Sequence, residues 1–172
     1  LQSRGLGDVY KRQGYIMLNI TLICVGKIKE KFYCGAIDEY KKRLSRFCKL
    51  NIIQVKDEPN EDGQQKIVLN KEAEKIAAKI PKGAYIISLC VEGKQLSSEQ
   101  LSEKIESLSV TGESHIVFII GGSLGLDDSI KSISDLKLSF SKMTFPHQLM
   151  RVILLEQIYR AFTISAGITY HK

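Results

Sequence analysis

The chain has 172 residues, and its 25 Lys and Arg against 19 Asp and Glu give a formal net charge of +6. Hydrophobic residues make up 44% of the sequence, which is enough apolar surface to build one folded domain and excludes general disorder. Three prolines and 13 glycines exclude collagen-like architectures, and no apolar run approaches the roughly 20 residues that span a bilayer.

The first sixteen residues differ in character from the rest. They begin without methionine, show no helical or strand period, and lack the apolar stretch of a secretory signal. At Met17 the sequence changes to MLNITLICVG, which is typical of a strand. We therefore interpret residues 1–16 as a non-native leader and residues 17–172 as a single domain; an organelle transit peptide is the alternative.

The first half of this domain alternates strand and helix patterns. The run 18–25 predicts a strand, and apolar residues at a period near 3.6 predict a helix over 30–45. A short strand is expected over 50–55, before a polar loop. A helix is expected over 64–79, and Pro81 and Gly83 stop it.

The second half continues the same alternation. A third strand is expected over 84–91 and ends at Glu92-Gly93, and Ser97 with Gln100 predicts a capping box for the next helix. The remaining elements are a helix to about 108, a strand buried on both faces over 115–120, a short helix over 127–134, a short strand over 136–140 and an apolar helix over 147–165. Strands that alternate with helices predict an α/β domain with a mainly parallel sheet. A ligand crevice is expected beyond the carboxyl ends of its strands.

The charge is unevenly distributed along the chain. The leader contributes +2, residues 17–50 contribute +5, residues 51–130 contribute −5 and residues 131–172 contribute +4. A body that is basic at both ends is compatible with a nucleic-acid partner. The segment Lys41-Lys42-Arg43 with Arg46 and the C-terminal end are candidates for RNA contact; a solvated helix face is the alternative for the first of them.

The four cysteines, Cys24, Cys34, Cys48 and Cys90, form neither a C-x-x-C pair nor a zinc-type cluster with histidine. No metal site is therefore predicted. Reduced, packed thiols fit a cytoplasmic compartment best.

Two loops after strands are candidates for ligand binding. GGSLG at 121–125 lets the backbone approach a ligand, but no Gly-Lys-Ser/Thr follows, and the acids at 127 and 128 argue against a phosphate at that helix start. The segment LSFSKMTFPH at 138–147 leaves backbone groups that can read a purine edge. A tight turn is the alternative for the first loop. For the second, it is a loop with Phe140, Met143 and Phe145 packed inside.

The terminal helix and the tail are the third candidate. The helix carries Arg151 and Arg160 among apolar stripes that are wider than one sheet face usually covers, which indicates contact with another subunit. The two arginines are expected either in ion pairs or beside a bound anion. The chain then ends in Tyr170-His171-Lys172, which suits stacking and proton or phosphate contacts.

Four segments carry a resemblance to a known family. VGKIKEKF near the start, FIIGGSLGL at 118–126, LSFSKMTFPHQLMRVILLEQIYRAF at 138–162 and the terminal YHK resemble the RlmH family of SPOUT-class methyltransferases. The resemblance covers residues 17–172. It implies a SPOUT-type trefoil-knotted α/β fold, in which helices flank a mainly parallel sheet of five to six strands, and it implies a homodimer.

The resemblance also implies a reaction. S-adenosyl-L-methionine would donate a methyl group to N3 of a pseudouridine in 23S ribosomal RNA, on assembled ribosomes. By motif position, the cofactor contacts fall on Leu89, Gly121, Phe140, Ser141, Lys142, Met143, Thr144 and Phe145. His171 is the first candidate for contact with the target base, and Arg151 and Tyr170 assist it. Two alternatives remain: a transfer RNA methyltransferase of the same fold and a non-enzymatic ribosome-binding factor.

Overall fold

The structure is a computed structural model that describes residues 17–170. The leader interpretation for residues 1–16 and the predicted role of His171 therefore lie outside the described residues. Within residues 17–170, no helix is both long and apolar enough to cross a membrane.

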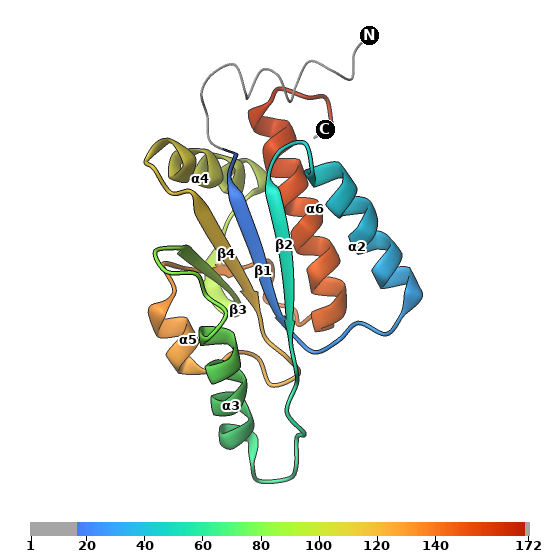
Figure 1. The fold of residues 1–172 in the computed structure, drawn as a ribbon, viewed down its shortest axis with the longest axis vertical. Helices are drawn as coiled ribbons and strands as arrows, with labels where there is room; N and C mark the ends of the chain where they lie inside the picture. Colours follow the sequence, from blue (N-terminus) through green and yellow to red (C-terminus); the bar gives the residue numbers. More distant parts are fainter. Residues whose placement is uncertain (1–16, 171–172) are drawn as a thin grey trace.

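Five parallel strands form one sheet with the order β2-β1-β4-β3-β5 (Figure 1). The strands are β1 (Asn19–Val25), β2 (Lys49–Val55), β3 (Tyr85–Gln95), β4 (His115–Ile120) and β5 (Leu136–Ser139). The predicted α/β class and the mainly parallel sheet of five to six strands are confirmed. The order and direction of the strands do not by themselves define a knot, so the trefoil knot stays a prediction.

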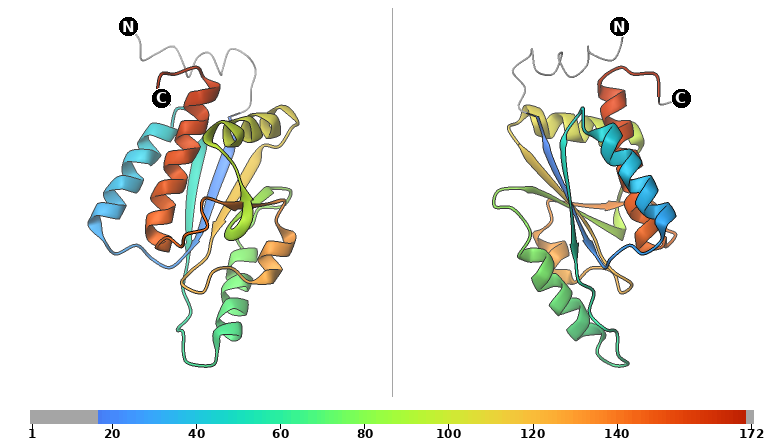
Figure 2. Two further views of the ribbon diagram at one scale, coloured as in Figure 1. Left: turned by 180° about the vertical axis from the view of Figure 1, so that it is seen from behind. Right: turned by 45° about the vertical axis from the view of Figure 1, so that its right-hand side comes forward.

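The direction of each crossover decides which face of the sheet each helix covers. The helices are α2 (Lys31–Leu44), α3 (Gln65–Ala77), α4 (Ser98–Val110), α5 (Asp128–Ile133) and α6 (His147–Ser165). The chain moves one way along the sheet through α2 and α4, and the other way through α3 and α5. Right-handed crossovers therefore place α2 and α4 on one face and α3 and α5 on the other. Figure 2 shows this arrangement, with α6 beside α2 and α4.

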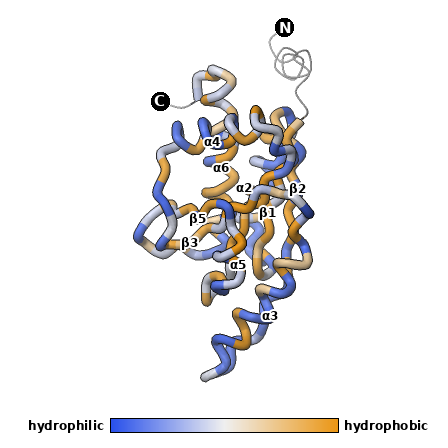
Figure 3. The backbone as a smooth tube through the Cα atoms, turned by 90° about the vertical axis from the view of Figure 1, so that its left-hand side faces the viewer, coloured by the Kyte–Doolittle hydropathy of each residue, from blue (hydrophilic) through white to orange (hydrophobic). Residues whose placement is uncertain are grey.

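The core consists of two clusters, one on each face of the sheet, and β4 contributes to both. Ile116, Phe118 and Ile120 pack on the side of α2, α4 and α6, whereas Val117 and Ile119 pack on the side of α3 and α5. All five side chains are buried, as the unbroken apolar run predicts. Figure 3 shows mostly hydrophobic residues in β1, at the centre of the sheet, and many hydrophilic residues in α3.

One strand boundary differs from the prediction. Glu92-Gly93 was expected to end the third strand, but β3 continues to Gln95 after a register shift between Leu89 and Lys94. Glycine allows this path, because a Cβ on Gly93 would lie 2.7 Å from the carbonyl group of Lys137 in β5. Gly93 therefore marks a close approach of two backbones and not a strand end.

The wide apolar surface of α6 is mostly satisfied within the chain. Leu154, Leu155 and Ile158 are fully buried, since α6 lies between α2 and α4 and against the sheet. Apolar side chains of the helix that stay half-buried are Leu149, Met150, Val152 and Ile153 in its N-terminal half and Ile164 near its end. Most of the apolar surface of α6, which the sequence analysis expected to contact another subunit, is therefore buried within the same chain.

The predicted capping box at the start of α4 is present. Ser97 Oγ accepts a hydrogen bond from the Gln100 backbone N–H at 3.1 Å, and Gln100 Oε1 accepts one from the Ser97 backbone N–H at 2.8 Å. We expect Ser97→Ala to lower the free energy of unfolding by about 1 kcal/mol, because the Gln100 backbone N–H loses its acceptor. Urea denaturation measures this change. Ser107→Ala on the same helix is the control and should change stability by less than about 0.5 kcal/mol.

Candidate functional site

A cavity of about 670 Å³ opens at the carboxyl ends of β3, β4 and β5. Its walls come from the second half of β3, the segments that follow β4 and β5, α5 and the start of α6. The lining residues are 89–92, 120–126, Lys131, 138–141, 143–147 and Met150. The volume lies within the range of about 300–1,000 Å³ that is usual for small-molecule sites. The expected crevice at the strand ends is therefore present.

The structure brings the predicted cofactor residues together around this cavity. Seven of the eight line it: Leu89, Gly121, Phe140, Ser141, Met143, Thr144 and Phe145. Lys142 is exposed and does not contribute to the lining. Their shared position fits a single binding site, and the contact of each residue with a cofactor stays a prediction.

The GGSLG loop is both a tight turn and a wall of the cavity. Gly122 and Gly125 form an antiparallel bridge, and Gly125 has a φ of +82°, a conformation that glycine adopts without steric cost. Gly121 is equally constrained, because a Cβ there would lie 2.3 Å from the Gly125 carbonyl oxygen. The two interpretations of this loop are therefore compatible.

Side-chain hydroxyls fix the loop after β5. Ser139 Oγ donates to the Ser141 carbonyl at 3.0 Å, and Ser141 Oγ accepts from the Met143 backbone N–H at 3.0 Å. Phe140 is half-buried against the core, whereas Met143 is 75% exposed. The alternative of a loop with all its large side chains packed inside is thus wrong for Met143.

Two charged residues in the cavity wall were not predicted from the sequence. Glu92 follows the first part of β3, and Lys131 lies on α5; both line the cavity, and Lys131 Nζ donates to Glu92 Oε1 at 2.5 Å. The Lys131 ammonium group holds the pKa of Glu92 below its usual range, and Glu92 raises the pKa of Lys131. A charged residue directly after a strand was the only signal in the sequence for Glu92.

Arg151 does not line the cavity and joins α6 to the end of β1. Its side chain is 1% exposed, and Nη2 donates to the carbonyl oxygens of Val25 and Gly26 at 2.7 and 2.8 Å. Among the described residues, Nε and Nη1 are buried without a hydrogen-bond partner. The Arg151 guanidinium group therefore contacts the protein backbone. Contact with a bound base stays a prediction.

Histidine burial gives the protein a predicted pH dependence. The pKa of His147, in the cavity wall, lies below its ordinary value, because burial disfavours the charged form and Arg151 repels it, while Asp57 opposes the shift. Burial also lowers the pKa of His115, whose Nε2 lies 2.7 Å from Thr21 Oγ1.

The unfolded chain therefore binds protons that the folded chain excludes, so stability rises with pH in the range below the ordinary histidine pKa of about 6.5. We expect the free energy of unfolding to fall between about pH 7 and about pH 5. Urea denaturation of His147→Gln at both pH values should show a smaller fall than the wild type. An equal fall in both would contradict this assignment.

The buried cysteines do not provide a nucleophile. Burial raises the pKa of Cys24 and of Cys48 to about 12, so both remain thiols at neutral pH. Residues 17–170 also contain no group of three His, Cys, Asp or Glu side chains that is arranged to hold a metal ion.

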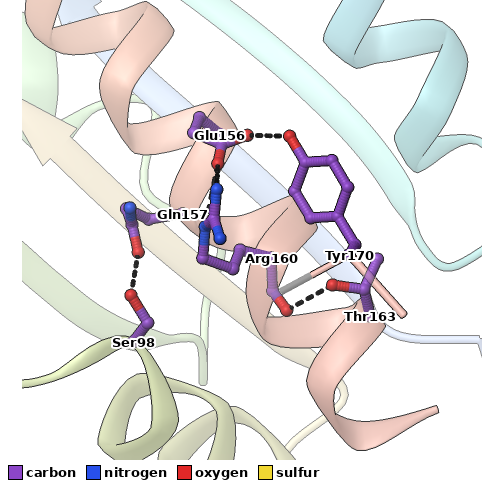
Figure 4. A network of polar contacts seen from close by, with 6 residues as sticks. All are labelled: Ser98, Glu156, Gln157, Arg160, Thr163 and Tyr170. Atoms are coloured by element: carbon purple, nitrogen blue, oxygen red, sulfur yellow. Dashed lines mark hydrogen bonds and ion pairs between the residues drawn. The ribbon is translucent and has the colours of Figure 1, made fainter. Parts of the chain in front are cut away.

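Tyr170 packs on α6, away from the cavity of the same chain. Tyr170 Oη donates to Glu156 Oε2 at 3.0 Å, and Glu156 Oε1 accepts from Arg160 (Figure 4). Roughly 14 Å of helix axis separates Glu156 from His147 in the cavity wall, at about 1.5 Å per residue. Within one chain, Tyr170 and the cavity are thus separate.

The basic segment of α2 lies beside this tail cluster. The Arg43 guanidinium lies 5.7 Å from the ring centre of Tyr159 and pairs with Glu39, and Arg46 Nη2 donates to Tyr159 Oη at 3.4 Å. Both arginines thus contact aromatic rings, while Lys41, Lys42 and Arg46 are exposed, so a solvated helix face remains compatible with this segment. Their contact with RNA stays a prediction.

Comparisons with known proteins define the class of protein. A family model described as "Predicted SPOUT methyltransferase" matches residues 18–171. A probable methylase family protein from Haemophilus influenzae has a similar fold, with a TM-score of 0.53 and 13% identity; the match covers 91% of this chain and 72% of that one. The chain belongs to the SPOUT methyltransferase family.

Curated relatives narrow this class further. The ribosomal RNA large subunit methyltransferase H of Bifidobacterium adolescentis is 58% identical over 159 residues, and the match covers 90% of this chain and all of the relative. The protein of that name from Clostridium novyi is 55% identical over the same length and coverage. A putative one from Methanococcus maripaludis is 57% identical, also with 90% and 100% coverage.

Proposed function

We propose that this chain methylates large-subunit ribosomal RNA with S-adenosyl-L-methionine as methyl donor, at N3 of a pseudouridine. The observation that carries the proposal is the cavity at the ends of β3, β4 and β5, whose walls hold seven of the eight predicted cofactor residues. The names of the relatives support ribosomal RNA as the substrate. Action on ribosomes would place the reaction in the cytoplasm.

The residues present fit an adenosine-containing cofactor. Apolar side chains, among them Leu89 and Phe140, can cover the purine, and the backbone of the two loops offers donors and acceptors for its edge. Gly121 and Gly125 keep that backbone free of side chains. When bound, S-adenosylmethionine supplies an electrophilic methyl group.

The chain itself must orient the acceptor nitrogen and remove its proton. An imide N–H is weakly acidic, so a base or a nearby cation has to favour the anion. We assign contact with the base to His171, assisted by Tyr170. We assign Arg151 to positioning, because its guanidinium is buried under the end of β1. Alignment of the two reacting atoms supplies up to roughly 7–11 kcal/mol of the barrier reduction in favourable cases.

A homodimer would bring tail and cavity together. Tyr170 lies away from the cavity of its own chain, so a second subunit is the natural source of this residue, and of His171 next to it in sequence, for each site. The half-buried apolar residues Leu149, Val152 and Ile153, on one face of α6 near the cavity, suit such a contact. In analytical ultracentrifugation we expect the wild type to sediment as a dimer and Val152→Glu to sediment as a monomer.

Three measurements test the proposed function against its alternatives. Calorimetry should detect S-adenosylmethionine binding; absence of binding would favour a non-enzymatic ribosome-binding factor. Methyl transfer should occur on intact ribosomes and not on transfer RNA. Mass spectrometry of ribosomal RNA from a deletion strain should show the loss of one methyl group on a pseudouridine, and methylation of transfer RNA instead would favour the second alternative.

A further inference from the structure

The cavity wall contains one ion pair that the predicted cofactor residues do not explain. Glu92 lies on the part of β3 that leaves the register with β5, and Lys131 lies on α5, which packs against β3. Both residues line the cavity, so their ion pair joins two of its walls. Of the other described lining residues, only His147 is titratable to a cation, and none is acidic.

The carboxylate of Glu92 has acceptor capacity to spare. A carboxylate offers about four lone-pair sites. Lys131 Nζ occupies one of them, and the backbone N–H of Glu92 itself also lies close enough to stabilise the charge. About two sites are then left for neutral donors. Because Lys131 neutralises the charge of Glu92, the ion pair offers hydrogen-bond acceptors to a ligand while its net charge is zero.

This combination matches a vicinal diol. The two hydroxyls of a ribose are neutral donors on adjacent carbons, and a carboxylate is the usual acceptor for them in nucleotide sites. The hydroxyls of Ser139 and Ser141 are less suited, because both are engaged within their own loop. Glu92 is thus the acidic acceptor that the described part of the wall provides.

We propose that Glu92, held in place by Lys131, accepts hydrogen bonds from the ribose hydroxyls of the cofactor. This inference rests on the proposed function, since it takes the ligand to be S-adenosylmethionine. It adds a binding residue, Glu92, and a positioning residue, Lys131, to the motif-derived set. Removal of the carboxylate charge should weaken binding about tenfold, as expected for one hydrogen bond to a charged group.

The experiment is calorimetric titration of the full chain with S-adenosylhomocysteine and with its 2′-deoxy analogue. The wild type should bind S-adenosylhomocysteine about tenfold more tightly than the analogue, and Glu92→Gln should reduce this preference to about twofold or less. Glu39→Gln is the matched control. It breaks an exposed ion pair on α2, outside the cavity, and should bind like the wild type.

A third probe distinguishes contact with the ribose from contact with the amino-acid end of the cofactor. Glu92→Gln should also weaken binding of 5′-methylthioadenosine, which has the ribose but no amino-acid group. An unchanged affinity for this probe would assign Glu92 to the cofactor's ammonium group and overturn the proposal. Equal losses for S-adenosylhomocysteine and its 2′-deoxy analogue would overturn it too, because they indicate a purely structural role.

Lys131 has its own readout. Lys131→Met should lower the 2′-hydroxyl preference about threefold, and Lys131→Arg should restore it, because a cation again orients the carboxylate. A preference that neither variant changes would remove the positioning role. If the wild type binds none of these ligands, the proposed function itself fails, whereas wild-type binding with an unchanged Glu92→Gln variant overturns only this inference.

Discussion

Gly121→Ala is expected to lower the affinity for S-adenosylmethionine by about 10- to 100-fold, which corresponds to roughly 1–3 kcal/mol of strain from overpacking. The added Cβ would lie 2.3 Å from the carbonyl oxygen and 2.5 Å from the carbonyl carbon of Gly125. These are backbone atoms of the same turn, which cannot rotate away as a flexible side chain would. The turn has to open, and it forms one wall of the cavity. Calorimetric titration measures the loss.

The chain offers a matched control for this change. Gly35 lies within α2, and a Cβ there meets no atom within 4 Å. Gly35→Ala should leave cofactor affinity unchanged and stabilise the fold by about 0.5–1 kcal/mol, because alanine favours a helix interior. Wild-type affinity in Gly121→Ala would show that the turn is not part of the binding site.

Arg151→Ala is expected to lower the free energy of unfolding by about 3–5 kcal/mol. Arg151 is among the largest fully buried side chains, and its loss leaves a cavity. It also leaves the carbonyl oxygens of Val25 and Gly26 without the donor that Nη2 provides. Urea denaturation measures the change.

Arg151→Met separates volume from hydrogen bonding. It keeps most of the buried volume and removes the two buried, unpartnered donors, so it should cost less than half of the alanine change. Single-turnover methyl transfer on ribosomes at a temperature where both variants are folded then tests the proposed positioning role. Rates within about twofold of the wild type would remove Arg151 from the mechanism.

Local patterns predicted the elements of the fold well. The unbroken apolar run at 115–120 predicted the central, doubly buried β4, and Ser97 with Gln100 predicted the capping box. The prediction was wrong at Gly93, because a glycine that permits close backbone approach looks the same in sequence as one that ends a strand. Such a distinction depends on β5, more than forty residues further along the chain.

The site was predictable only in part, for a similar reason. Glycine and hydroxyl loops after strands are visible as short motifs, and the structure places GGSLG and the loop after β5 on one cavity. Lys131 carries no local signal, and Glu92 has only its place after an expected strand, since each looks like an ordinary surface charge until the fold makes them neighbours. Arg151 was singled out by its place in an apolar helix, but its backbone partners on β1 lie far away in sequence.

The segments that line the cavity are spread along the chain, so the cavity can form only late during synthesis. β3 and β4 emerge first, but the loop after β5 and α6 belong to the last part of the chain. A nascent chain that ends before this part has the central strands of the sheet but lacks α6, which covers one of their faces, and it has no complete pocket. A ligand that binds only the finished pocket therefore stabilises complete chains selectively, so its concentration would affect the lifetime of newly made protein as well as the rate of reaction.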